Sequence, residues 1–191
     1  IAGIERSLQI LAVVNVGVGL WVLAKLIGKS RAVALVPAMA ALGVIVFLIA
    51  APGSLRVWDQ KYFAIFRSNQ TDAFRTPELA REAMDNTDVL YYSEGTDSTV
   101  SVIQVKGGDQ AFITNGRVEA GSQLQAQQLQ LTLGHVPMLL HQNPKDVLVV
   151  GLGSGMTAGA TTVHPSVESV TLVELEPQVK GVARTFDALN H

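Results

Sequence analysis

Four residues of the sequence have the types and spacing of a nucleoside-binding site. The stretch Val147–Ala160, VLVVGLGSGMTAGA, predicts an apolar strand that runs into a glycine turn and then a helix. Glycine is needed where the backbone turns sharply and a ligand approaches it closely. Glu174 follows the turn by about 20 residues, where an acid at the end of the next strand accepts both hydroxyls of a ribose. The predicted nucleoside-binding residues are Gly151, Gly153, Gly155 and Glu174.

The spacing of the glycines indicates which kind of nucleoside is bound. The turn has the form G-x-G-x-G, whereas dinucleotide enzymes commonly have G-x-G-x-x-G, with a pyrophosphate at the helix N-terminus. The shorter form is more typical of adenosyl-sulfonium ligands. It favours S-adenosylmethionine or its decarboxylated relative and does not separate the two. A turn without a ligand and an NAD-dependent dehydrogenase are the alternatives.

The elements that must position these residues form the opening of a parallel sheet. Strands are predicted over Val147–Val150 and Ser169–Leu175, and each is followed by a helical pattern, the second over Gln178–Leu189. The order strand, helix, strand, helix is typical of a doubly wound sheet. A helix over Gln123–His141 precedes it, and Pro137 is expected to kink that helix near its end.

Upstream, the pattern changes to the alternation of strands. Strands are predicted over Val89–Tyr92, Thr99–Val105 and Gln110–Thr114, and Asn115-Gly116 is a tight-turn dipeptide. These segments predict a small antiparallel unit of three or more strands.

A connector of mixed charge comes before this unit. Within it, Thr76-Pro77-Glu78 has a capping hydroxyl, a proline and an early acid, which predicts the start of a helix that runs to about Met84.

The N-terminal part is markedly apolar. Ser7–Ala24 and Ala32–Leu55 contain no charged residue, and Lys25–Arg31 is a polar turn between them. Because roughly 20 apolar residues span a bilayer, we predict a transmembrane helical hairpin and a multi-pass inner or plasma membrane protein; two buried core helices are the alternative. Basic residues are balanced between the two sides, so only the supply of cofactor favours a cytoplasmic soluble domain.

Composition excludes several classes of function. The net charge is −2 and the 14 basic residues are scattered, so no nucleic acid partner is expected. The chain has no cysteine, which excludes disulfides and thiolate metal sites. His135 and His141 have no third ligand nearby in the sequence, and no metal is predicted.

The stretch from Leu90 to Phe186 resembles the spermidine synthase (polyamine aminopropyltransferase) family, and more closely its bacterial branch fused behind membrane helices. The residues that carry the resemblance are YYSEGTDSTVSV, NGRVEA, LGHVPMLLHQNPKDVLVVGLGSG and VESVTLVELEPQV. It implies a β domain followed by a Rossmann-like (methyltransferase-type) domain. It also implies transfer of an aminopropyl group from decarboxylated S-adenosylmethionine to putrescine, with release of methylthioadenosine.

The resemblance adds residues to the predicted site. Ser154 stands where the family often has an Asp that binds the aminopropyl side of the cofactor. Thr99 replaces a Gln of an early strand, and Gln130 lies in a helix where the family has acidic residues. Thr99 and Gln130 are therefore the candidate substrate-binding residues, and the missing acids leave the amine substrate open.

These observations combine into one prediction. The chain is expected to be an α/β protein with a transmembrane hairpin (1–55), a linker (56–88), a β unit (89–122) and the first part of a Rossmann-like domain (123–191). It would be a truncated, inactive fragment of a membrane-anchored aminopropyltransferase, because the catalytic acid is expected beyond His191. The predicted partners are a polyamine such as putrescine and the lipid bilayer, with a homodimer as a further option. Methyl transfer, a lost activity and an NAD-dependent dehydrogenase are the alternatives.

Overall fold

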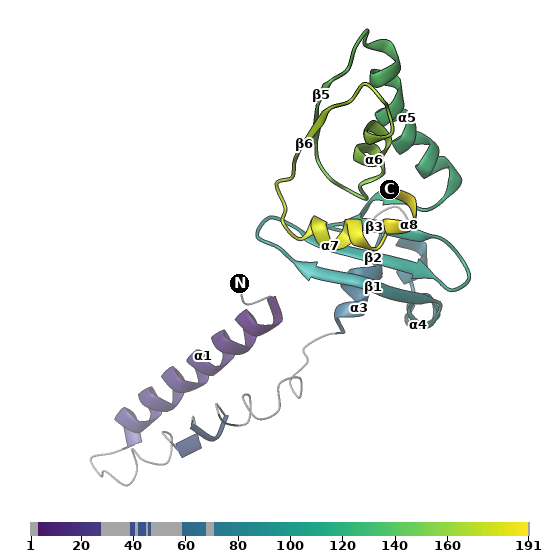
Figure 1. The fold of residues 1–191 in the computed structure, drawn as a ribbon. Coiled ribbons are helices and arrows are strands. Elements are labelled where there is room, and N and C mark those ends of the chain that lie inside the picture. Colours follow the sequence, from purple (N-terminus) through teal and green to yellow (C-terminus); the bar gives the residue numbers. More distant parts are fainter. Residues whose placement is uncertain are drawn as a thin grey trace. The chain divides into compact units, whose positions relative to one another are not determined.

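The computed structural model describes residues 4–27, 39–40, 42–44, 46, 59–67 and 71–190. They belong to two compact units, Ile1–Asp59 and Gln60–His191 (Figure 1). The first unit contains α1 (Ile4–Ile27). The second contains both sheets and all the residues predicted to bind a ligand. The finer division of the second unit into a linker, a β unit and a Rossmann-like part stays a prediction.

The predicted membrane hairpin is wrong. The first predicted span, Ser7–Ala24, lies within α1, and most of the second, Ala32–Leu55, lies outside the described residues. Among the described residues, no helix combines the length and the apolar character that crossing a membrane requires. The prediction counted only missing charges, yet polar residues such as Asn15 interrupt the run, and the Asn15 amide donates to the Leu11 carbonyl at 2.8 Å. The predicted multi-pass membrane localisation is wrong with it, and the described residues do not show the bilayer as a partner.

An antiparallel sheet forms the first half of the second unit. Its strands are paired in the order of the chain, and Asn115 and Gly116, with φ of 48° and 80°, form the tight turn between the last two. The three predicted strands are confirmed, and a fourth follows the turn. The strands are β1 (Thr87–Glu94), β2 (Thr99–Val105), β3 (Gln110–Thr114) and β4 (Arg117–Gly121).

Both faces of this sheet are covered, because alternate residues of its central strands are apolar on both sides. On one face, Val100 and Val102 pack with residues of α7 (Val179–Arg184) and with Phe186. On the other face, Ile103 packs with Ile65 and Met84. The helices of this second face are α3 (Gln60–Ile65), η1 (Thr71–Phe74) and α4 (Pro77–Asp85) (Figure 1).

The predicted start of α4 is confirmed. Thr76 is the N-cap and its hydroxyl accepts from the Leu79 N–H at 3.4 Å, while Pro77 occupies the first turn, where its missing N–H costs nothing. The cap fixes where a helix that covers the sheet begins.

The second half of the unit contains a parallel strand pair. β5 and β6 are paired in register from Asp146↔Ser169 to Val150↔Val173, which confirms the predicted order strand, helix, strand, helix. The second predicted helix, Gln178–Leu189, is divided into two short helices. The elements are α5 (Leu124–Leu140), β5 (Asp146–Val150), α6 (Met156–Thr162), β6 (Ser169–Val173), α7 and α8 (Asp187–Asn190).

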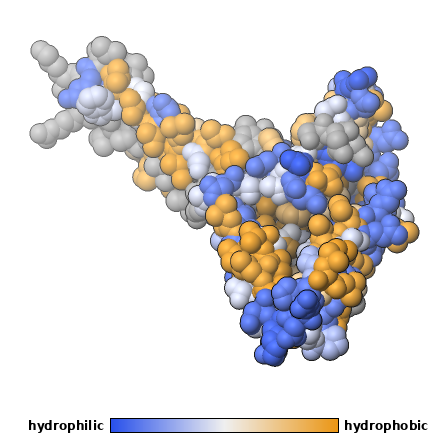
Figure 2. Space-filling model, turned by 90° about the horizontal axis from the view of Figure 1, so that it is seen from above, coloured by the Kyte–Doolittle hydropathy of each residue, from blue (hydrophilic) through white to orange (hydrophobic). Residues whose placement is uncertain are grey.

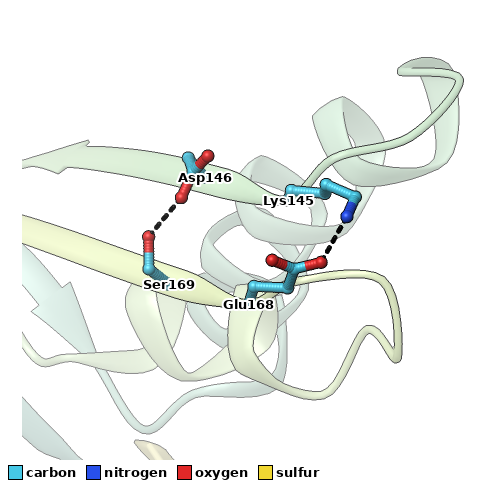
Figure 3. A network of polar contacts seen from close by, with 4 residues as sticks. All are labelled: Lys145, Asp146, Glu168 and Ser169. Atoms are coloured by element: carbon cyan, nitrogen blue, oxygen red, sulfur yellow. Dashed lines mark hydrogen bonds and ion pairs between the residues drawn. The ribbon is translucent and has the colours of Figure 1, made fainter.

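Polar side chains tie the two parallel strands together where they begin (Figure 3). Lys145 forms an ion pair with Glu168, and the Ser169 hydroxyl donates to Asp146 Oδ1 at 2.6 Å. These contacts lie at the end of the strands opposite the glycine turn, so they hold the register without entering the site.

α5 and α6 pack closely because α5 has a glycine at the contact. A Cβ at Gly134 would lie 2.6 Å from both the Ala160 Cβ and the Thr157 carbonyl oxygen. The Thr157 hydroxyl donates to the Gln130 carbonyl at 3.0 Å. This contact fixes the helix that follows the glycine turn against the helix that precedes β5.

Candidate nucleoside-binding site

The glycine turn has the left-handed backbone that only glycine adopts readily. Gly151, Gly153 and Gly155 have φ of 91°, 54° and 85°. A Cβ at either of the first two would meet no heavy atom within 4 Å, whereas one at Gly155 would lie 2.8 Å from Asn190 Nδ2. The first two glycines therefore keep one side of the turn open to a ligand, and the third permits close packing of α8.

Glu174 reaches back from the end of β6 to this turn. Its Oε2 accepts from the Leu152 N–H at 2.7 Å and its Oε1 accepts from the Glu176 N–H at 2.9 Å. A carboxylate has about four acceptor positions, so these two bonds orient the side chain and leave positions for ribose hydroxyls. The acid and the turn that the sequence places about 20 residues apart are thus in contact.

The structure also brings Ser154 and Gln130 together. Ser154 is 1% exposed, and its hydroxyl forms a short hydrogen bond with Gln130 Oε1. The Gln130 amide donates in turn to the Ala126 carbonyl at 3.1 Å. These two residues form a neutral, mutually satisfied pair beside the turn.

A cavity of about 540 Å³ lies over the turn, between the antiparallel sheet and the carboxyl ends of the parallel strands. Most of its lining is apolar, which is typical of a small-molecule site. Four carboxylates also line it, and none of the described lining residues is basic. The acids are Asp97, Glu119, Glu174 and Glu176.

One predicted residue does not reach this cavity. The structure does not place Thr99 in the lining, whereas its neighbour Ser98 is there. The Thr99 N–H donates to Asn115 Oδ1 at 2.9 Å. Thr99 is the first residue of β2. Of these two neighbours, Ser98 is the one that lines the cavity.

The sequence-based prediction missed Glu176. It follows Glu174 by two residues, lines the same cavity and is 7% exposed. The signal available was the repeat of Glu at alternate positions in VELEP, since alternate residues of an extended segment point to the same side.

Two histidines form a pair away from the cavity. His135 Nδ1 lies 2.9 Å from His164 Nε2, which links α5 to the segment after α6. The sequence suggested no such pairing, because 29 residues separate the two.

Comparison with known proteins shows which family this region is similar to. Residues 127–186 match the model of the spermine/spermidine synthase domain. The resemblance to the spermidine synthase family is confirmed. The polyamine aminopropyltransferase of Streptococcus pneumoniae serotype 4 is 31% identical over 97 residues, which are 51% of this chain and 34% of that protein. The spermidine synthase of Dictyostelium discoideum is 33% identical over 99 residues, with the same two shares.

A solved structure is similar over about half of the chain. A spermidine synthase in complex with the transition-state analogue AdoDATO is 30% identical and covers 51% of this chain and 33% of its own, with a TM-score of 0.47. The chain spans about a third of the length of the spermidine synthase relatives that it matches.

Proposed function

We propose that the cavity binds the adenosyl part of decarboxylated S-adenosylmethionine, and that the protein serves aminopropyl transfer to a polyamine such as putrescine. The observation that carries the proposal is the pairing of an open glycine turn and Glu174 with an anionic cavity. The family match and the relatives' names, polyamine aminopropyltransferase and spermidine synthase, support it.

The charge of the cavity favours this ligand over its competitors. Four carboxylates and no basic side chain are found among the described lining residues, and Glu119 pairs with Arg117 outside the lining at 3.6 Å. The excess of negative charge attracts cations and repels anions. Decarboxylated S-adenosylmethionine carries a sulfonium and an ammonium group and no carboxylate. S-Adenosylmethionine has an additional carboxylate and NAD has a pyrophosphate. Either anionic group would lie near these acids, and none of the described lining residues is basic and could bind it.

The lining also fits the neutral part of a nucleoside. Val150 and Leu175 line the cavity and are 79% and 83% exposed. An aromatic base that lay against them would remove apolar surface from water, at about 25 cal/mol per Å². With the ribose on Glu174, the base and the sugar would both contact groups at the carboxyl ends of the parallel strands, where ligands of such sheets bind.

The reaction needs little from this part of the chain beyond binding and orientation. The amine nitrogen attacks the methylene carbon next to the sulfonium sulfur, and the electron pair of the broken C–S bond goes to sulfur. The product thioether is neutral, and the amine gives up one proton. We assign the role of proton acceptor to none of the described residues.

Methyl transfer from S-adenosylmethionine is the second candidate, and one observation favours it. Ser154 and Gln130 form a neutral pair where the family resemblance implies an acid that binds the aminopropyl side. A neutral pair would tolerate the methionine carboxylate better than an acid would.

Calorimetric titration with methylthioadenosine, S-adenosylhomocysteine and NAD tests the proposal. We expect methylthioadenosine to bind most tightly and NAD not to bind. Glu174→Gln should weaken the binding of methylthioadenosine about tenfold or more, because charge-assisted hydrogen bonds contribute roughly 1.5–3 kcal/mol. Glu168→Gln, which changes the same charge far from the turn, is the matched control and should bind as the wild type does.

Three outcomes would contradict the proposal. Unchanged affinity of folded Glu174→Gln would remove the ribose assignment. Tightest binding of S-adenosylhomocysteine would favour methyl transfer. Binding of NAD alone would favour a dehydrogenase.

A further inference from the structure

Glu176 is a buried carboxylate without an ion-pair partner among the described residues. It is 7% exposed. Its two hydrogen bonds are long, since the Ser98 hydroxyl and the Gln178 N–H both donate to it at 3.4 Å. No ion pair of the described residues includes Glu176.

The hydrogen bonds of Glu174 are shorter than those of Glu176. Both oxygens of Glu174 accept backbone N–H groups at less than 3 Å, namely 2.7 and 2.9 Å. Removing a carboxylate from water is costly unless strong hydrogen bonds or an opposite charge compensate. Glu174 has that compensation, and Glu176 does not.

The burial of Glu176 is built into the fold. A Cβ at Gly95 would overlap the Glu176 carboxylate. Glycine therefore lets the connection between β1 and β2 close over the acid, and the Gly95 N–H donates to the Ser98 carbonyl at 2.8 Å within that connection. The carboxylate is held at the cavity wall by Ser98, which lies 78 positions earlier in the sequence.

We infer that Glu176 binds an ammonium group of the cationic ligand, an inference that rests on the proposed function. Two residues of extended chain span at most about 7 Å, so a nucleoside on Glu174 with a three-carbon aminoalkyl chain can reach Glu176. Ser154 and Gln130 satisfy each other beside the turn. The ammonium therefore lies at the wall that Ser98 and Glu176 form, away from that neutral pair.

Two synthetic thioethers of adenosine test this assignment. One carries a 3-aminopropyl group on the 5′ sulfur and the other a propyl group, so they differ by the ammonium alone. Wild-type protein should bind the aminopropyl compound about tenfold or more tightly, as expected for a charged hydrogen bond. Glu176→Gln should bring the two affinities to within about twofold and leave the propyl compound unchanged.

Asp97→Asn is the matched control, because Asp97 lines the same cavity but is exposed. Asp97→Asn and Glu119→Gln each remove an exposed carboxylate whose attraction for the ligand is screened by solvent, so each should keep most of the preference for the ammonium. If Glu176→Gln does not fold, loss of the preference in either of these two variants still overturns the assignment, and its retention in both supports it.

The outcomes separate this inference from the proposed function. If wild-type protein binds neither thioether, the proposed function fails. If it binds both equally, or if folded Glu176→Gln keeps the preference, the inference about Glu176 is wrong and the proposed nucleoside site is retained. Glu176 would then have only a structural role, in holding the connection between β1 and β2 against the parallel strands.

Discussion

The antiparallel sheet and the parallel strand pair contain similar apolar residues, yet their surroundings differ. In the sheet, Val100 and Ile103 are buried on opposite faces by two sets of helices. In the parallel pair, Leu148, Val150 and Val173 are exposed, and Figure 2 shows hydrophobic side chains at the surface beside hydrophilic ones. Both regions contain apolar residues that favour strands, and the two regions differ in how far other elements cover those residues.

We expect the antiparallel sheet to contribute mainly to stability and the parallel strand pair mainly to ligand binding. The sheet has two buried clusters and supplies a rigid wall of the cavity through Phe112 and Ala120. The parallel pair precedes the turn and Glu174, and of its three exposed apolar residues Val150 lines the cavity. Substitutions in the sheet should act on unfolding, and substitutions at the carboxyl ends of the pair should act on binding.

The sharpest test of this comparison is a matched pair of truncations. Ile103 in the sheet is 1% exposed and Leu148 in the parallel pair is 63% exposed. Ile103→Ala should lower the free energy of unfolding by about 2–5 kcal/mol, and Leu148→Ala by no more than about 0.5 kcal/mol. Urea denaturation followed by circular dichroism measures both. Equal losses would show that the two regions do not differ as described.

An intermediate effect is expected where the two helices next to the turn touch. Gly134→Ala places a methyl group against the Ala160 side chain and the Thr157 backbone, and overpacking of this kind typically costs about 1–3 kcal/mol. Gln128→Ala on the exposed side of α5 is the control and should change stability by less than about 0.5 kcal/mol. A neutral Gly134→Ala would mean that α5 and α6 can separate without loss.

The smallest effect is expected at the amino ends of the parallel strands. Lys145 and Glu168 form an exposed ion pair (Figure 3), and such pairs contribute about 0–1 kcal/mol. Lys145→Met should therefore shift the urea midpoint only slightly, and less at 1 M salt than at low salt. A larger loss of stability that does not depend on salt would show that this end of the parallel strands stabilises the fold as the antiparallel sheet does.

Local signals in the sequence predicted much of the second unit. The alternating residues of Thr99–Val105 gave the bounds of β2, and the cap at Thr76 gave the start of α4. The contact between Glu174 and the turn was also predictable, because paired parallel strands bring their carboxyl ends together. Each of these features depends on residues close in sequence or on a regular pairing.

Features that depend on distant residues were not predictable. The burial of Glu176 requires Gly95, and the His135–His164 contact requires the packing of α5 on α6. The membrane prediction failed for another reason, because the absence of charge in Ser7–Ala24 was taken as sufficient for a membrane span. The cavity is lined by Ser98, the neighbour of the predicted Thr99, and this depends on the packing of the sheet against the parallel strands.

The central claim is that a nucleoside binds at the glycine turn, and amide chemical shifts test it most directly. Glycine amides resonate in a separate region of a ¹H–¹⁵N spectrum, so titration with methylthioadenosine can be followed at Gly151 and Gly153. We predict saturable shifts at these two amides and none at Gly107 and Gly108, which lie in the turn between β2 and β3, away from the cavity lining. Unchanged Gly151 and Gly153 amides at saturating methylthioadenosine would contradict the account.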